Sequence, residues 1–292
     1  MARAGRWAAL DKWVAQHCWH PRVLPFLIYI LLLGVILFVR PRLPAAYPFL
    51  YVGQCGVVAW LLWRYRKLTP ELTLRFHWMA IPVGVCIFTW WVLLGRGTAH
   101  LLNTYKPAMF PLPTGAEDFR KPEQLGLAGG WITLILRLVG MSLVVPLMEE
   151  LFVRSLLLRS LHSFRRTMIG VLQVVQDLPA LGEWFMLTKL GTQAARHPPV
   201  FGAEFKRVPL GSLSFFGVAA STAIFALHHQ VRDWPAAVVC GVMYCLLVWY
   251  TRHDPKLGLG PVIWAHGITN ALLWGYAVFG PSFGCPEGWQ FL

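Results

Sequence analysis

Charged residues are scarce in this chain. Asp, Glu, Lys and Arg together make up 13% of its 292 residues, about half the share typical of a soluble globular domain. Hydrophobic residues make up 57%, and the mean hydropathy is +0.54. So few polar groups cannot cover the surface of a water-soluble fold of this size. The composition therefore excludes a soluble protein and predicts a polytopic membrane protein.

Acidic residues are only half as frequent as basic ones. The chain has 13 Asp and Glu against 26 Lys and Arg, a formal net charge of +13. The basic residues fall mostly in short segments between apolar runs, and no separate polar domain is left to bind nucleic acid. Nucleic acid is therefore not an expected partner. The distribution fits the positive-inside rule and contact with anionic lipid head groups instead.

Several catalytic and metal-binding signatures are absent. The six cysteines are scattered without a Cys-x-x-Cys pair, so neither a disulfide framework nor a zinc knuckle is predicted. The chain also lacks Gly-x-Ser-x-Gly, His-Glu-x-x-His and the phosphate-binding P-loop. A serine mechanism, a His-Glu-x-x-His zinc protease and a P-loop nucleotidase therefore have no motif to support them.

Seven apolar runs approach the ~20 residues that a helix needs to cross the hydrocarbon core. They predict an all-α, polytopic transmembrane helix bundle of seven to eight spans. The eighth span would lie in the semi-apolar stretch Leu151–Gly211 and would reverse the orientation of everything after it. The seven runs are Leu24–Val39, Ala46–Trp63, His77–Gly95, Gly129–Met148, Ser212–His228, Pro235–Tyr250 and Pro261–Gly280.

Basic residues are distributed unevenly between the two sides of this seven-span arrangement. With the N-terminus inside, the inner segments carry 18 Lys and Arg residues and the outer segments carry 7. The asymmetry predicts an integral membrane protein with a cytoplasmic N-terminus. The loop Arg96–Ala128 would then lie outside.

Ionisable groups at membrane depth are costly and mark functional sites. The first such cluster is Glu149-Glu150-Leu-Phe-Val-Arg154, at the end of the fourth apolar run. On a helix Glu150 and Arg154 are four residues apart and can form an ion pair, whereas Glu149 is turned about 100° away. Glu149 is thus a candidate general base. The alternative is a charged helix end at the lipid head groups.

Two further polar clusters follow on later helices. Phe225 and His229 are four residues apart and share a helix face, with His228 directly beside them in the sequence. His266 and Asn270 have the same spacing and offer adjacent donors, as an oxyanion hole requires. A hydrogen-bonded membrane histidine and a polar contact between helices are the respective alternatives. Taken together, the three clusters favour a hydrolytic site.

The three clusters read Glu-Glu-x-x-x-Arg, Phe-x-x-x-His and His-x-x-x-Asn in this order along the chain. In this the sequence resembles the CPBP family of intramembrane proteases, which comprises CAAX-type prenyl endopeptidases and Abi-type bacteriocin-processing enzymes. The C-terminal half, with its terminal Trp289-Gln-Phe291, most resembles the exosortase-associated branch. The resemblance implies a protease core in residues 129–292 and a bacterial inner membrane location, whereas residues 1–128 hold N-terminal spans and an outer loop without a diagnostic motif.

The resemblance implies an intramembrane endopeptidase that cleaves a membrane-anchored protein or peptide. Glu149, assisted by His229, would activate a water molecule that attacks a peptide carbonyl. His266 and Asn270 would stabilise the oxyanion. The supporting residues would be Glu150, Arg154 and Phe225.

The same resemblance leaves the use of metal open. No cofactor is expected under the glutamate mechanism, which is favoured because asparagine is a poor zinc ligand and a good oxyanion donor. In the metal-dependent alternative, zinc would be held by Glu149, His229 and His266. Two other functions fit the bundle: a non-catalytic membrane immunity or assembly factor, and a zinc-dependent hydrolase of lipid-linked substrates.

The seven-span arrangement conflicts with a shared site. It places Glu149 and His266 near the inner face but His229 at the far end of its helix. Roughly seventeen helical residues then separate the two depths by about 25 Å. Strong tilting, a deep cavity or an eighth span would each reconcile these depths. His228 is expected about 100° away from the catalytic face, either at a polar rim or hydrogen-bonded to a neighbouring helix.

Overall fold

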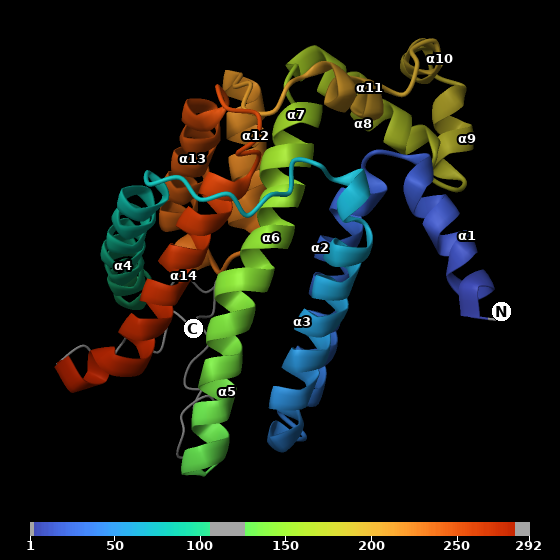
Figure 1. The fold of residues 1–292 in the computed structure, drawn as a ribbon. Coiled ribbons are helices and arrows are strands. Elements are labelled where there is room, and N and C mark those ends of the chain that lie inside the picture. The colour runs from blue at the N-terminus through green and yellow to red at the C-terminus, as the bar shows by residue number, and fades with distance from the viewer. Residues whose placement is uncertain (1–2, 106–125, 284–292) are drawn as a thin grey trace.

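The protein is a bundle of helices. Its computed structural model describes residues 3–105 and 126–283, and every regular element in these two ranges is a helix (Figure 1). The terminal Trp289-Gln-Phe291 and most of the expected loop Arg96–Ala128 lie outside the described residues.

Six helical stretches are long and apolar enough to cross a membrane, and they correspond to six of the seven expected runs. This confirms a polytopic helical bundle and an integral membrane protein. The stretches are His20–Val39 (α2), Pro44–Arg64 (η1, Pro44–Ala46, and α3, Tyr47–Arg64), Ala80–Thr98 (in α4, Ala80–Tyr105), Ala128–Ser160, Val231–Thr251 (η7, Val231–Asp233, and α13, Trp234–Thr251) and Gly260–Phe279 (α14).

The longest helix carries the two glutamates. Its expected end at Met148 is wrong, because the helix continues to Ser160 and buries Glu149, Glu150 and Arg154 on the way. Two π-helical turns, which are frequent at functional sites, flank the glutamate segment α6. The parts are α5 (Leu127–Val139), π-helical η5 (Gly140–Val144), α6 (Val145–Glu150), π-helical η6 (Leu151–Leu157) and α7 (Leu158–Ser160).

The seventh expected span, Ser212–His228, is the shorter helix α12 (Phe215–Leu227). Its 13 residues extend for about 20 Å, less than the ~30 Å hydrocarbon core. Ser214 caps its first turn by accepting a hydrogen bond from Gly217 N, and its hydroxyl donates to His162 O at 2.6 Å. The helix therefore begins beside the end of α7.

This arrangement resolves the conflict in depth. The helix α12 runs antiparallel to the second half of the long helix, so that its C-terminal end lies about 20 Å from His162. Glu149 lies at a similar depth, about 17 Å before the end of the long helix at Ser160. The chain then turns through η7, and α13 packs back against α12. The expected 25 Å separation arose from ending the fourth span too early.

Four short helices connect α7 to α12 at one end of the bundle (Figure 1). Within this described stretch none is long enough to span a membrane, so the alternative eighth span is not found there. The buried carboxylate of Glu204 joins two of the helices, at 2.6 Å from Arg166 and 2.7 Å from Arg207. The helices are α8 (Phe164–Gln176), α9 (Leu181–Met186), α10 (Lys189–Ala195) and α11 (Val200–Arg207).

Helix α14 packs antiparallel to the long helix. Asn270 donates to Met141 O at 2.7 Å, and Trp274 donates to Leu134 O at 2.8 Å. Three residues before Asn270, a Cβ on Gly267 would lie 2.5 Å from the carbonyl oxygen of Ser142. Only glycine allows the two backbones to approach so closely.

The N-terminal helices share the core of the bundle with the C-terminal ones. One cluster of buried apolar residues joins Val58 of α3 and Ile87 of α4 to residues of α6, η6, α12, α13 and α14. Residues 1–128 thus supply part of the packing around the polar clusters. The remaining described elements are α1 (Arg3–Gln16), η2 (Arg66–Leu68) and η8 (Gly280–Phe283).

Candidate active site

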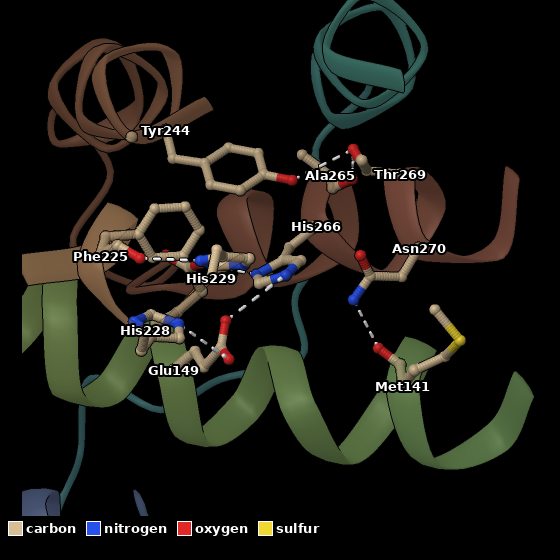
Figure 2. Close-up of polar contacts among 12 residues, drawn as sticks. Met141, Glu149, Phe225, His228, His229, Tyr244, Ala265, His266, Thr269 and Asn270 are labelled. Atoms are coloured by element: carbon tan, nitrogen blue, oxygen red, sulfur yellow. Dashed lines mark hydrogen bonds and ion pairs between the residues drawn. The ribbon is translucent and has the colours of Figure 1, made fainter. Parts of the chain in front are cut away.

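Glu149 lies between histidines of two other helical segments (Figure 2). Its Oε1 is 3.4 Å from Nε2 of His228, and its Oε2 is 3.7 Å from Nε2 of His266. The Glu149 side chain is only 9% exposed. A carboxylate at this depth requires polar partners, and the histidines supply them. The three sequence clusters therefore meet at Glu149.

His228 makes the direct contact from the α12 segment to Glu149. This agrees with the expected polar contact to a neighbouring helix, whereas the alternative position at a polar rim, away from the catalytic face, is wrong. Helix α12 ends at Leu227, so the 100° separation of consecutive helical residues no longer applies to the two rings. Their centroids are 4.3 Å apart. His229 has its Nδ1 2.8 Å from Phe225 O, and its ring lies edge-on to Trp91 of α4.

Glu150 is the centre of a second, fully buried polar group. Its Oε2 is 3.2 Å from Nε of Arg154, which confirms the ion pair expected from their spacing. Its Oε1 also accepts a hydrogen bond from Nδ1 of His266 at 2.7 Å. Glu150 thus links the arginine of the first motif to the histidine of the third and orients the His266 ring.

Two aromatic rings enclose this buried ion pair. The guanidinium carbon of Arg154 is 4.5 Å from the ring centroid of Phe225 and 5.1 Å from that of Tyr244. Such contacts stabilise a desolvated cation. Phe225 also packs against His229, as its spacing predicts, with ring centroids 4.8 Å apart. The phenylalanine of the second motif therefore links Arg154 of the first motif to His229 of its own.

His266 and Asn270 lie on one face of α14, directed toward the long helix (Figure 2). With Nδ1 of His266 hydrogen-bonded to Glu150, Nε2 is the ring atom left toward Glu149. The Asn270 amide uses one N–H for Met141 O and has a second N–H to donate. Thr269, on the other side, donates to Gly84 O and accepts from Tyr244.

A cavity of about 260 Å³ brings these side chains together. All four residues expected to be catalytic lie in its wall, on three helical segments that are far apart in the sequence. The lining residues are Trp91, Met141, Val145, Glu149, His228, His229, Gln230, Arg232, Asp233, Cys240, Tyr244, His266, Thr269, Asn270 and Leu273.

One comparison decides the family. Residues 131–272 match the family described as Rce1-like type II CAAX prenyl endopeptidases, and the match spans all three motifs. This segment belongs to the Rce1-like family. The match supports a CAAX-type membrane protease, a family that acts on membrane-associated proteins. The exosortase-associated branch is not part of the match and stays a prediction. No curated protein and no solved structure gives a significant match to the chain.

Some residues of the Rce1-like site were not anticipated from the sequence. Trp91 comes from α4, where no motif marks it, and Tyr244 reads as an ordinary core residue of α13. The adjacent Arg232 and Asp233 carry a usable signal, since two charges lie directly before an apolar run. Both line the cavity at the tip between α12 and α13.

The zinc alternative for this site stays a prediction. Within residues 3–105 and 126–283 no three His, Cys, Asp or Glu side chains are arranged to hold one metal. Zinc ligands lie about 2.0–2.2 Å from the ion. The Nδ1 atoms of His229 and His266 are engaged with Phe225 O and Glu150, so Nε2 is the ring atom of each that remains for a further contact.

Proposed function

We propose that the protein is an intramembrane endopeptidase that hydrolyses a peptide bond with a water molecule activated by Glu149. The observation that carries this proposal is the position of the Glu149 carboxylate. It faces a cavity within the bundle, 3.4 Å from His228 and 3.7 Å from His266. A nearly buried carboxylate beside imidazoles is suited to accept a proton from water and to return it later.

The proposed reaction proceeds in two steps. In the first, Glu149 accepts a proton from water while the water oxygen bonds to the peptide carbonyl carbon, and His229 in the cavity wall assists in positioning that water. In the second, the C–N bond breaks and Glu149 returns the proton to the leaving nitrogen. The products are a carboxylic acid and an amine.

The negative charge formed on the carbonyl oxygen requires donors. Asn270 has a second N–H to donate, and His266 directs its Nε2 toward the same cavity. Glu150 holds the His266 ring in place, in the way that a carboxylate orients the histidine of a hydrolytic triad. Removing one oxyanion donor typically lowers kcat by about 10²–10³-fold.

The proposed substrate is a membrane-anchored protein or peptide, since the cavity opens within the helical bundle. We place the protein in a bacterial inner membrane with a cytoplasmic N-terminus. The short helices α8–α11 lie at the same end of the bundle as the segments joining α3 to α4 and α13 to α14 (Figure 1). Most of the basic residues outside the spans are in these segments, which favours contact with anionic lipid head groups on that side.

The decisive experiment replaces Glu149 by Gln, which keeps the shape of the side chain and removes the base. The purified full chain is reconstituted in liposomes with a prenylated, CAAX-terminated reporter peptide, and the same peptide without the prenyl group serves as a second probe. Glu183→Gln, on the exposed side of α9, is the matched control. We expect Glu149→Gln to abolish cleavage and the control to cleave like wild type. Equal cleavage by both variants would overturn the role of Glu149 as the base. No cleavage by the wild type would favour the non-catalytic immunity or assembly factor, in which the bundle alone matters.

A further inference from the structure

The segment between α3 and α4 crosses the bundle and lies on the start of α14 (Figure 1). Within it, residues Glu71–Arg75 form what we call the strap. Glu71 O accepts a hydrogen bond from Leu259 N at 2.9 Å, and Leu74 O accepts one from Trp264 Nε1 at 2.9 Å. A Cβ on Gly260 would lie 2.2 Å from Arg75 O, so the strap and α14 are in backbone contact.

The side chain of Glu71 fixes the strap to two other helices. Its carboxylate receives two hydrogen bonds from the guanidinium of Arg22 in α2, at 2.7 and 2.8 Å, and a third from the hydroxyl of Ser155 in η6. The Arg22 and Glu71 side chains are 5% and 9% exposed. Burial raises the pKa of Glu71, but the hydrogen bonds and charge of Arg22 outweigh this effect and hold its pKa below the usual value. The carboxylate is therefore charged at neutral pH.

The two attachment points of Glu71 belong to the two sides of the cavity. Ser155 directly follows Arg154 on the helix of Glu149 and Glu150. Leu259 directly precedes α14, the helix of His266 and Asn270. A single residue, Glu71, therefore connects the helix that carries Glu149 to the helix that carries His266 and Asn270.

We propose that Glu71 is a positioning residue of the active site and sets the register of α14 against the long helix. The proposal rests on the function proposed above. Glu71 and Arg22 both lie outside the matched residues 131–272. The N-terminal part of the chain therefore contributes hydrogen bonds that hold the protease segment, through Ser155. The strap does not line the cavity. Its loss therefore changes the alignment of catalytic groups more than the binding of substrate.

The size of the effect follows from the tolerance of the site. His266 Nδ1 and Glu150 Oε1 are 2.7 Å apart, and such a contact is lost if α14 shifts by about 1 Å. Misplacement of catalytic groups by about 1 Å costs on the order of 10²-fold in rate. We expect Glu71→Gln to lower kcat about 10- to 100-fold and to change KM less than about threefold.

The test compares four full-length proteins in the same liposomes: wild type, Glu71→Gln, Glu71→Asp and Asp11→Asn. Asp11 pairs with Arg64 at 2.6 Å, but the two side chains are 42% and 27% exposed, so Asp11→Asn controls for loss of an ion pair as such. We expect Asp11→Asn to match wild type and Glu71→Asp to recover part of the lost kcat. Wild-type kcat in Glu71→Gln would overturn the proposal.

Hydrogen exchange provides a readout that does not depend on cleavage. The amides of residues 257–264 should exchange faster in Glu71→Gln than in wild type, because Leu259 N donates to the strap. If the wild type cleaves no reporter, the proposed function fails. The role of Glu71 is tested separately, because unchanged exchange of residues 257–264 in Glu71→Gln would overturn it whether or not the reporter is cleaved. If Glu71→Gln does not fold, Glu71→Asp and Arg22→Lys take its place. Wild-type kcat and exchange in both of these would overturn the proposal.

Discussion

The close approach of α14 to the long helix allows a quantitative prediction at Gly267. A Cβ at this position would lie 2.5 Å from Ser142 O, whereas an ordinary contact begins at 3.4 Å. Gly267→Ala therefore requires the backbones to separate locally by about 0.9 Å. Overpacking of this kind typically costs ~1–3 kcal/mol, and the better helix propensity of alanine returns up to about 1 kcal/mol. The expected loss of stability is about 0–2 kcal/mol.

Activity should respond far more strongly than stability. A separation of that size along the line from Asn270 Nδ2 to Met141 O would lengthen their 2.7 Å hydrogen bond to about 3.6 Å, beyond hydrogen-bonding range. Since a displacement of about 1 Å costs on the order of 10²-fold in rate, we expect Gly267→Ala to lower kcat by about 10²-fold.

Gly275 provides a matched control on the same helix, because its added Cβ would meet nothing within 4 Å. Gly275→Ala should keep wild-type kcat and raise stability by about 0.5–1 kcal/mol. The assay pairs reporter cleavage in liposomes with thermal unfolding in detergent. Equal kcat in the two variants would refute the reasoning, because α14 would then tolerate displacement at the oxyanion donors.

Three further predictions follow from the site and its surroundings. His229→Ala should lower kcat about 10²–10⁴-fold, and His228→Ala at least tenfold because it removes the direct partner of Glu149; a wild-type rate for His228→Ala would contradict that contact. Chelators should leave cleavage intact, and a loss that zinc alone restores would support the metal-dependent alternative. Burial raises the pKa of Glu204, but the hydrogen bonds of Arg207 and the charge of Arg166 lower it overall. Its stabilisation is therefore present above the unfolded pKa of about 4.3 and is lost as pH falls through the lower folded value. Glu204→Gln should make the Tm fall less steeply as the pH is lowered. An unchanged fall would count against a stabilising role of the ion pairs of Glu204 with Arg166 and Arg207.

Local spacing was sufficient to predict several contacts of the site. The ion pair of Glu150 with Arg154 and the packing of Phe225 on His229 both follow from the position of residues four apart on a helix. The composition likewise determined a helical membrane protein, because a chain with 13% charged residues cannot form a soluble surface. These properties depend on neighbours in the sequence or on totals, so no tertiary information was needed.

Depth in the membrane was decided by tertiary structure. The sequence suggested that the fourth span ends at Met148, because charged residues are costly in lipid. Arg154 nevertheless lies inside the bundle, since Glu150 neutralises it and the rings of Phe225 and Tyr244 cover it. Hydropathy reports the cost of exposing a side chain to lipid and does not report compensation by other helices.

The choice of long-range partners was also beyond the sequence. The end of α12 at Leu227 turns His228 toward Glu149, and the antiparallel packing of α14 joins His266 to Glu150. The bond from Glu71 to Arg22 and Ser155 connects residues 49 and 84 positions apart. The sequence thus determined which side chains can take part in catalysis. The packing of the helices determined which of these side chains meet, because contacts between helices depend on where each helix ends and on which backbones can approach closely.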